Sequence, residues 1–205
     1  MKAWLIILFL LPITALAGLD EDVRALQNEW AEIKYRRPAA EQEKAFAALT
    51  KTADTVRGQY AGRAEPQIWY GIIVASHAGA RGGLGALSLA KDARKAFEQA
   101  LELDAKALDG SAYTSLGSLY YQVPGWPIGF GSDDKARELL EKAIALNPDG
   151  IDSNYFLGDF LYRKGDHAGA RRALQKALQA PARPERALAD EGRRKEIEAL
   201  LAAMR

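Results

Sequence analysis

Hydrophobic residues recur three or four positions apart along most of this sequence, which gathers them on one face of an α-helix. The clearest stretch, residues 107–179, contains the same pattern twice. In each copy a small glycine, Gly117 or Gly158, marks one helix, and an Ala-x-x-x-Leu-x-x-Ala row marks the next. Glycine lets the second helix approach the first closely, and the row is the i, i+4, i+7 stripe that receives it. The pattern predicts hairpins of helices.

The spacing between the two copies indicates the kind of repeat. Gly117 and Gly158 are 41 positions apart, whereas the first alanines of the two rows, Ala136 and Ala170, are 34 apart. The shorter spacing is that of a tetratricopeptide repeat (TPR), roughly 34 residues. The first copy carries seven extra residues at its turn. The sequence therefore predicts an all-α, TPR-like solenoid with an insert in one repeat.

Other helix pairs are expected before these copies. The predicted domain, residues 18–205, consists of a degenerate N-terminal pair at 20–62 and repeats at 66–105, 109–148 and 150–181. In the pair at 66–105, Gly71 or Ala75 could be the small contact residue. A glycine-rich turn at 79–85 is expected to join its two helices.

A final helix, residues 188–204, is expected to cap the array. Pro181 ends the last repeat, and a terminal helix with one polar face closes the exposed end of a stack. The charged residues of this helix are expected to be solvated: Asp190, Glu191, Arg193, Arg194, Lys195 and Glu196.

Residues 1–17 have the features of a secretory signal peptide: Lys2, an apolar run, and Ala15-Leu16-Ala17 as a cleavage site. The run is shorter than the about 20 residues of a membrane span, and an uncleaved anchor is the alternative. Lys2 is the only charged residue of this segment, so the mature chain is formally neutral. Electrostatic capture of nucleic acid or of an anionic membrane is therefore not indicated.

No sequence motif indicates catalytic chemistry. The chain has no cysteine, which excludes disulfides, a thiolate nucleophile and lipid attachment at the cleavage site. No serine stands in a nucleophile-elbow context, and the two histidines, His77 and His167, lack ligand-like neighbours. We expect neither an enzyme nor a cofactor or metal site.

The insert, residues 122–132, combines two prolines and three glycines with Trp126, Ile128 and Phe130. Proline and glycine indicate a loop, and the large apolar residues indicate that this loop is not simply solvated. One interpretation is a structural plug, with Trp126 and Phe130 packed against neighbouring helices. The other is that the loop walls a hydrophobic groove and contacts a ligand or partner, and the two can hold for different residues.

First helices of such hairpins line the concave side of a solenoid. Continuing the repeat pattern places a mixed polar and aromatic set of candidate binding residues there: Ser111, Thr114, Ser118, Tyr121, Asp152, Tyr155, Asp159 and Tyr162. Asp152 is also expected to be the N-cap of its helix. An ordinary solvated face would have the same composition.

The segment 109–131, with its Pro-Gly-Trp-Pro-Ile-Gly-Phe-Gly run, and its continuation through 136–160 resemble the TatT-type T component of tripartite ATP-independent periplasmic (TRAP) transporters. The stretches 83–89 and 188–194 fit the same family. The resemblance covers most of the mature chain. It implies an α-solenoid in the periplasm that associates with a TRAP substrate-binding protein and can pass on a hydrophobic ligand.

The sequence leaves two non-catalytic functions open. One is an accessory of TRAP-type solute uptake, and the other is a generic TPR interaction scaffold of the cell envelope. The chain has no lipid-attachment cysteine, so a cleaved form would be free in the periplasm. The exposed ends of a solenoid and the apolar loop also leave a homo-oligomer open, and the sequence does not identify the partner, the ligand or the number of subunits.

Overall fold

A computed structural model describes the backbone of residues 13–204 and the side chains of 18–204 except Leu84. The expected signal peptide, residues 1–17, therefore lies outside the fully described residues. The described elements are, in order, α1 (Ile13–Arg36), α2 (Ala39–Gln59), α3 (Ala64–Arg81), α4 (Gly83–Asp104), α5 (Ala107–Gln122), α6 (Asp133–Leu146), α7 (Ile151–Arg163), α8 (His167–Leu178), the 3₁₀ turn η1 (Pro184–Arg186) and α9 (Ala187–Ala203). The predicted all-α fold is confirmed.

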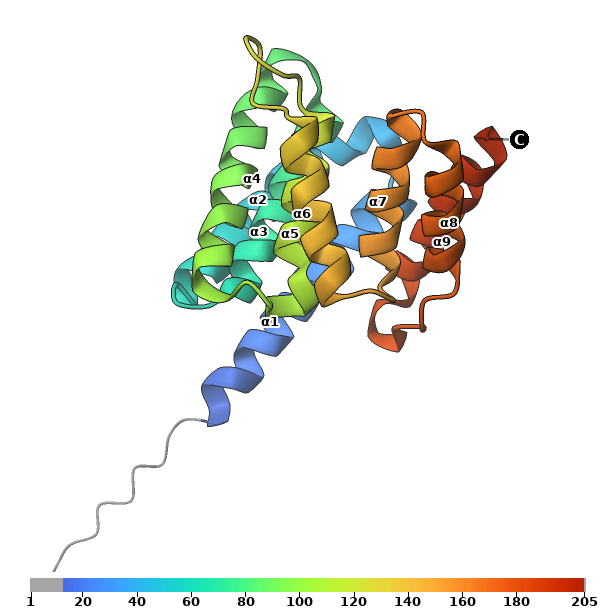
Figure 1. The fold of residues 1–205 in the computed structure, drawn as a ribbon. Coiled ribbons are helices and arrows are strands. Elements are labelled where there is room, and N and C mark those ends of the chain that lie inside the picture. Colours follow the sequence, from blue (N-terminus) through green and yellow to red (C-terminus); the bar gives the residue numbers. More distant parts are fainter. Residues whose placement is uncertain (1–12, 205) are drawn as a thin grey trace, which may run out of the picture.

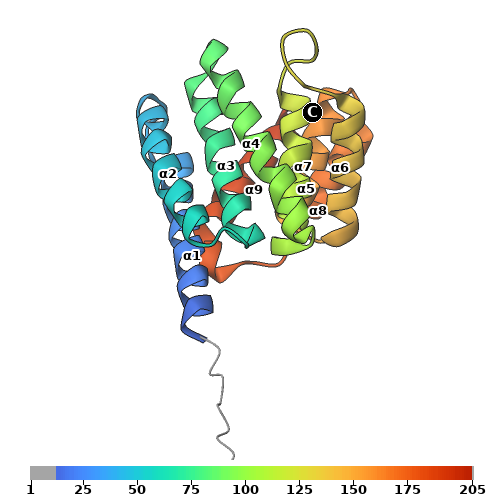
Figure 2. The ribbon, with the colours of Figure 1, turned by 90° about the vertical axis from the view of Figure 1, so that its left-hand side faces the viewer.

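The helices form hairpins that stand side by side, as Figures 1 and 2 show. Within the array α3 packs on α4, α5 on α6 and α7 on α8, and each pair contacts the next. The first helices α3, α5 and α7 also contact one another in sequence, which is the arrangement of a TPR-like solenoid.

Small residues stand where the paired helices approach most closely. A Cβ on Gly117 would meet the Leu140 side chain at 2.9 Å, and one on Gly158 would meet Leu174 at 2.7 Å. Leu140 and Leu174 are both fully buried, as are the alanines of the two rows. The role that the sequence pattern gives to these glycines is therefore confirmed.

The pair α3/α4 uses Gly71 as its contact residue, which settles the choice between Gly71 and Ala75. Phe97 of α4 is fully buried, and its ring lies directly over Gly71, where a Cβ would come within 2.5 Å of a ring carbon. Ala75 is only partly buried. An aromatic ring fills the space that leucine fills in the later pairs.

We predict opposite effects for the same substitution at two glycines of α3. Gly71→Ala should lower the free energy of unfolding by about 1–3 kcal/mol, because the new methyl group overlaps the Phe97 ring. Gly79→Ala should raise it by about 0.5–1 kcal/mol, because Gly79 is helical with open space around it. Urea unfolding of both variants measures the difference; equal effects would contradict this packing.

The expected turn at 79–85 is wrong. Helix α3 continues to Arg81, and Gly82 alone separates it from α4. Gly82 and Gly83 take φ values of 63° and 60°, a left-handed conformation that glycine adopts without a steric penalty. Two glycines are thus sufficient to reverse the chain, and the other glycines of the stretch belong to helices.

Helix α9 does more than cap the array. Its apolar residue Ile197 is buried with Ile151 and Leu174, so it covers α7 and α8 as a capping helix does. It also contacts α1, and Gly192 lies so close to α1 that a Cβ there would overlap the Tyr35 ring. The last helix therefore joins the two ends of the array (Figure 2).

Candidate functional site

The insert is an ordered loop that projects beyond the ends of α5 and α6 (Figure 1). The Gly131 N–H donates to the Pro124 carbonyl at 2.9 Å, which closes the loop across its base. The Ser132 N–H donates to the Tyr120 carbonyl at 3.0 Å and ties the end of the loop to α5. These backbone hydrogen bonds hold the loop in one conformation.

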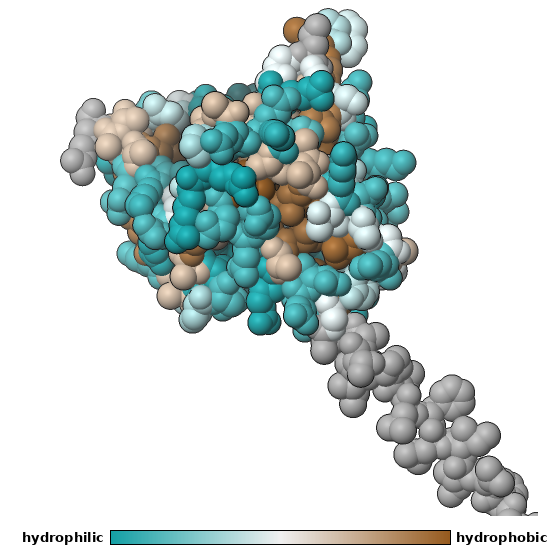
Figure 3. Space-filling view, turned by 180° about the vertical axis from the view of Figure 1, so that it is seen from behind, coloured by the Kyte–Doolittle hydropathy of each residue, from teal (hydrophilic) through white to brown (hydrophobic). Residues whose placement is uncertain are grey.

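The aromatic and aliphatic residues of the insert divide into two groups. Phe130 packs edge-to-face on Tyr120, with ring centroids 5.6 Å apart, and the Arg94 guanidinium lies 4.6 Å from its centroid. Trp126 and Ile128 are 89% and 67% exposed. The structural interpretation thus holds for Phe130 and fails for Trp126. In Figure 3 the loop stands clear of the molecular body.

Two of the hydroxyl groups proposed for α5, those of Ser111 and Ser118, are bound within their own helix. Ser111 donates to the Leu108 carbonyl at 2.6 Å, and Ser118 donates to the Ser115 carbonyl at 2.9 Å. Thr114 is buried. These three candidates lie along one helix but offer few free polar groups.

Tyr121 and Asp159 join two repeats. The Tyr121 hydroxyl donates to Asp159 at 2.7 Å, and Arg163 pairs with the same carboxylate at 3.1 Å. Burial, followed by the Asp159 charge, raises the pKa of Tyr121 well above its ordinary value. Tyr162 lies elsewhere on α7, edge-to-face with His167. The Tyr121–Asp159 pair is therefore a neutral phenol donating to a carboxylate that Arg163 also holds.

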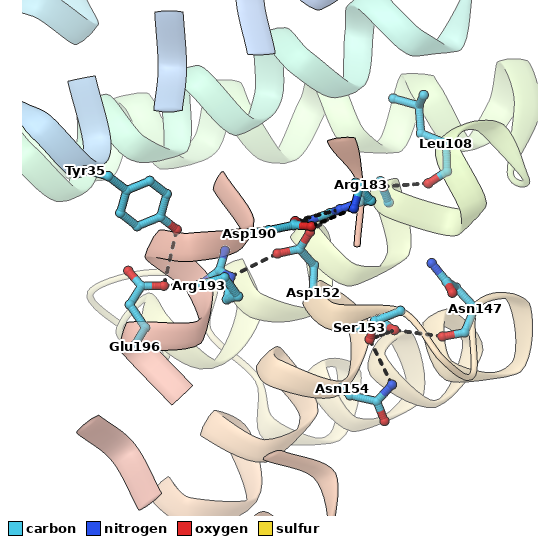
Figure 4. Close-up of polar contacts among 12 residues, drawn as sticks. Tyr35, Leu108, Asn147, Asp152, Ser153, Asn154, Arg183, Asp190, Arg193 and Glu196 are labelled. Atoms are coloured by element: carbon cyan, nitrogen blue, oxygen red, sulfur yellow. Dashed lines mark hydrogen bonds and ion pairs between the residues drawn. The ribbon is translucent and has the colours of Figure 1, made fainter. Parts of the chain in front are cut away.

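Asp152 is not the N-cap of α7, because the helix begins at Ile151 with Gly150 before it. Its carboxylate instead accepts hydrogen bonds from Arg183 at 3.0 Å and from Arg193 at 2.9 Å (Figure 4). The Arg193 guanidinium also lies 4.2 Å from the Tyr155 ring centroid. Asp152 and Tyr155, both expected on the concave face, therefore contact the C-terminal part of the same chain.

We call residues 183–196 the C-terminal strap. Within it Asp190 binds Arg183 at 2.5 Å, and Glu196 binds Arg193 at 2.6 Å. Tyr35 of α1 donates to Glu196 at 3.4 Å (Figure 4). The prediction of a solvated charged face is wrong for Asp190 and Arg193, which are 6% and 7% exposed, because this face is turned toward α1 and α7.

Two opposing effects act on the pKa of Asp152. Burial raises the pKa, but the positive charges of Arg193 and Arg183 outweigh that effect and hold it well below its ordinary value. Arg186 lies 5.1 Å from the Trp69 ring centroid of α3, so the strap also contacts the middle of the array. The concave face is therefore occupied by a charged segment of the chain itself.

No group of three histidine, aspartate or glutamate residues that could hold a metal ion occurs in the described part of the chain. None of the helices between residues 13 and 204 is long and apolar enough to span a membrane. A cleft of about 610 Å³ between α1 and α2 is lined partly by Ala45, Leu49 and Lys44 and contains none of the predicted site residues.

Comparison with known proteins agrees with this geometry. Residues 134–187, from α6 to the residue after η1, match the family model described as tetratricopeptide repeat. Together with the stacked hairpins, this match defines the architecture as a TPR-type α-solenoid. The matching family is not a catalytic one. No curated protein matches the sequence.

Comparison with solved structures gives three matches. TTC0263, a thermophilic TPR protein in Thermus thermophilus, is 16% identical over 92% of this chain and 93% of its own, with a TM-score of 0.58. MamA is 20% identical over 80% of this chain and 89% of its own, with a TM-score of 0.46. The pilF protein of Pseudomonas aeruginosa is 14% identical over 91% of this chain and 90% of its own, with a TM-score of 0.38. The likeness to TTC0263 concerns the fold alone.

Proposed function

We propose that this protein is a non-catalytic TPR interaction protein of the periplasm that binds the substrate-binding protein of a TRAP-type uptake system. The signal-peptide pattern of residues 1–17 supports export. The Pro-Gly-Trp-Pro-Ile-Gly-Phe-Gly run supports the TRAP system, because it is the segment in which the chain most resembles TatT-type components. The binding element in this proposal is the insert.

The observation that carries the proposal is the exposure of Trp126 and Ile128 on an ordered loop. Tryptophan is enriched among the residues that dominate protein–protein binding energy. A loop already held by its own backbone hydrogen bonds loses less conformational entropy when a partner binds than a mobile loop does. An apolar pocket on the partner would remove both side chains from water, at about 25 cal/mol per Å² of apolar surface.

The concave face is a less suitable docking site for this partner, because the strap occupies it. Transfer of a hydrophobic ligand, the second role that the resemblance implies, remains part of the TRAP hypothesis and has no separate support from the concave residues. Asp152 and Tyr155 bind arginine there and present no apolar wall.

A generic envelope scaffold is the second candidate function. It is favoured by the family match, which is to the tetratricopeptide repeat in general. The two candidates share the insert as the binding element and differ in the partner. Mass spectrometry of proteins captured from periplasm distinguishes them: repeated recovery of a solute-binding protein supports the uptake role, and its absence refutes that role.

We expect Trp126→Ala combined with Ile128→Ala to reduce capture of the periplasmic partner at least 10-fold, since the two side chains form the center of the proposed contact. The free energy of unfolding should change by less than about 0.5 kcal/mol, because both residues are exposed. Capture by the immobilised variant, quantified by mass spectrometry, measures the effect.

Leu103→Ala is the matched control, because Leu103 is also a large apolar residue with 44% exposure but lies at the other end of α4 from the insert. It should leave capture unchanged. Equal capture by wild-type protein and by the double variant of the insert would refute the insert as the binding element.

A further inference from the structure

The concave face of a TPR solenoid is the surface on which such arrays bind extended partners. Here that surface is filled by the C-terminal strap, which reaches α1 through Tyr35, α3 through Trp69 and α7 through Asp152. The strap therefore stands where a partner segment would lie, and its contacts identify the chemistry that the surface accepts.

That chemistry is the recognition of guanidinium groups. The Asp152 carboxylate lies between Arg183 and Arg193 and accepts a hydrogen bond from each. The Arg193 guanidinium is also held against two aromatic rings, 4.2 Å from the Tyr155 centroid and 4.7 Å from the Phe156 centroid. A carboxylate beside aromatic faces suits arginine better than lysine, because the planar guanidinium both stacks and donates several hydrogen bonds.

The two halves of α9 are held by different forces. The C-terminal half inserts Ile197 into the apolar cluster on α7 and α8, together with Leu200 and Leu201. The strap is held through its charged side chains and also through Leu188 and Ala189, which pack against the apolar cluster of α1–α3. Buried ion pairs add little net stability compared with apolar packing, although they specify geometry strongly. The charged contacts of the strap are thus the ones that another segment of similar chemistry would reproduce.

The connection between α8 and the strap is not helical. Residues 179–182 contain Pro181 and lie outside any helix, and Pro181 and Ala182 are exposed. Arg194 of the strap donates to the carbonyl oxygens of Leu178 and Ala180, so release of the strap breaks these hydrogen bonds as well.

We propose that the concave face is a second binding surface, specific for an arginine-bearing helical segment of a partner protein, and that the strap occupies it until the partner binds. This surface is separate from the insert, so it goes beyond the function proposed above. The partner segment would place one guanidinium between Asp152 and the Tyr155 and Phe156 rings. Release of the strap would free the site.

Hydrogen exchange of the wild-type protein tests whether the strap opens independently. Amides of residues 187–196 should exchange at least 10-fold faster than those in the interiors of α7 and α8, through an opening smaller than global unfolding. Equal protection of the strap and of these helices would overturn the proposal, and this test requires no variant.

A labelled synthetic peptide of residues 181–204 tests the binding chemistry. It should bind the Arg183→Gln/Arg193→Gln variant, whose own strap is weakened, at least 10-fold more tightly than it binds the wild-type protein. Adding Asp152→Asn to this variant should abolish the gain in affinity for the peptide. A peptide carrying Arg193→Lys should also bind more weakly, because an ammonium group cannot stack and donate as guanidinium does.

Fluorescence anisotropy measures these affinities on variants whose folding circular dichroism has verified. Undetectable binding to the Arg183→Gln/Arg193→Gln variant would overturn the proposal, as would binding that does not depend on Asp152. Loss of peptide binding leaves capture through Trp126 unaffected, so failure of this proposal is distinguishable from failure of the insert as a docking element.

Discussion

Asp152→Asn is expected to lower the free energy of unfolding by about 3 kcal/mol, since it leaves the guanidinium groups of Arg183 and Arg193 without their shared carboxylate. This is the lower end of the range for breaking a buried ion pair, because the Asp152 side chain keeps 30% exposure. Urea unfolding near pH 7 measures the loss.

Asp149→Asn is the matched control three residues earlier in the chain. Its side chain is 77% exposed and pairs with Lys176, and an exposed pair contributes at most about 1 kcal/mol. Similar losses in the two variants would contradict the anchoring of the strap by Asp152.

The pH dependence of the Asp152→Asn effect has a defined sign. The pKa of Asp152 is lowered in the folded protein, so the stabilisation is fully present above the unfolded pKa of about 3.9 and is lost as pH falls toward the folded value. The difference between wild type and variant should therefore be constant from pH 7 to pH 5 and decrease below about pH 4.

Phe97→Ala is expected to lower the free energy of unfolding by about 3–5 kcal/mol, because the ring is fully buried between α3 and α4 and its removal leaves a cavity beside Gly71. The same cavity should reverse the effect of Gly71→Ala. That substitution overlaps the ring in the wild-type protein, whereas in the Phe97→Ala background its methyl group enters empty space and increases stability.

A double-mutant cycle measured by urea unfolding tests this reversal. The double variant should lose less free energy of unfolding than the sum of the losses in the two single variants. Additive losses would show that Gly71 and Phe97 do not contact each other and would contradict the observed α3–α4 packing.

The hairpins were predictable because their signal is local. Helical spacing and small residues such as Gly117 and Gly158 report how one helix meets its neighbour, and such contacts occur in the pairs α3/α4, α5/α6 and α7/α8. The glycine-rich turn is shorter than its composition predicts for a related reason. Glycine is compatible with both helix and turn, so composition alone did not show that only Gly82 and Gly83 need left-handed φ values.

The C-terminal strap could not be predicted from periodicity. Asp190 and Arg193 lie on a charged helix face that is indistinguishable in sequence from a solvated one. Their burial results from the return of α9 to α1, a contact between residues far apart in the chain. The same long-range contact explains why Asp152, a plausible helix cap by position, binds arginine instead.

The insert was predictable in kind but not in detail. Its prolines and glycines indicated a loop, and its aromatic content indicated more than a solvated turn. Which residues pack depended on neighbours that the local sequence does not identify. Arg94 and Tyr120 hold Phe130, whereas the tip of the loop carries Trp126 and Ile128 into solvent.

The central claim is that the two ends of the solenoid are joined across the concave face by α9. Disulfide formation in the Tyr35→Cys/Gly192→Cys variant tests it directly, because the chain has no other cysteine and these positions are in contact. We predict nearly complete intramolecular oxidation of the monomer, and little in a Tyr35→Cys/Lys195→Cys control, since Lys195 is exposed. Failure of the first pair to oxidise, or equal oxidation of both pairs, would contradict the closed array.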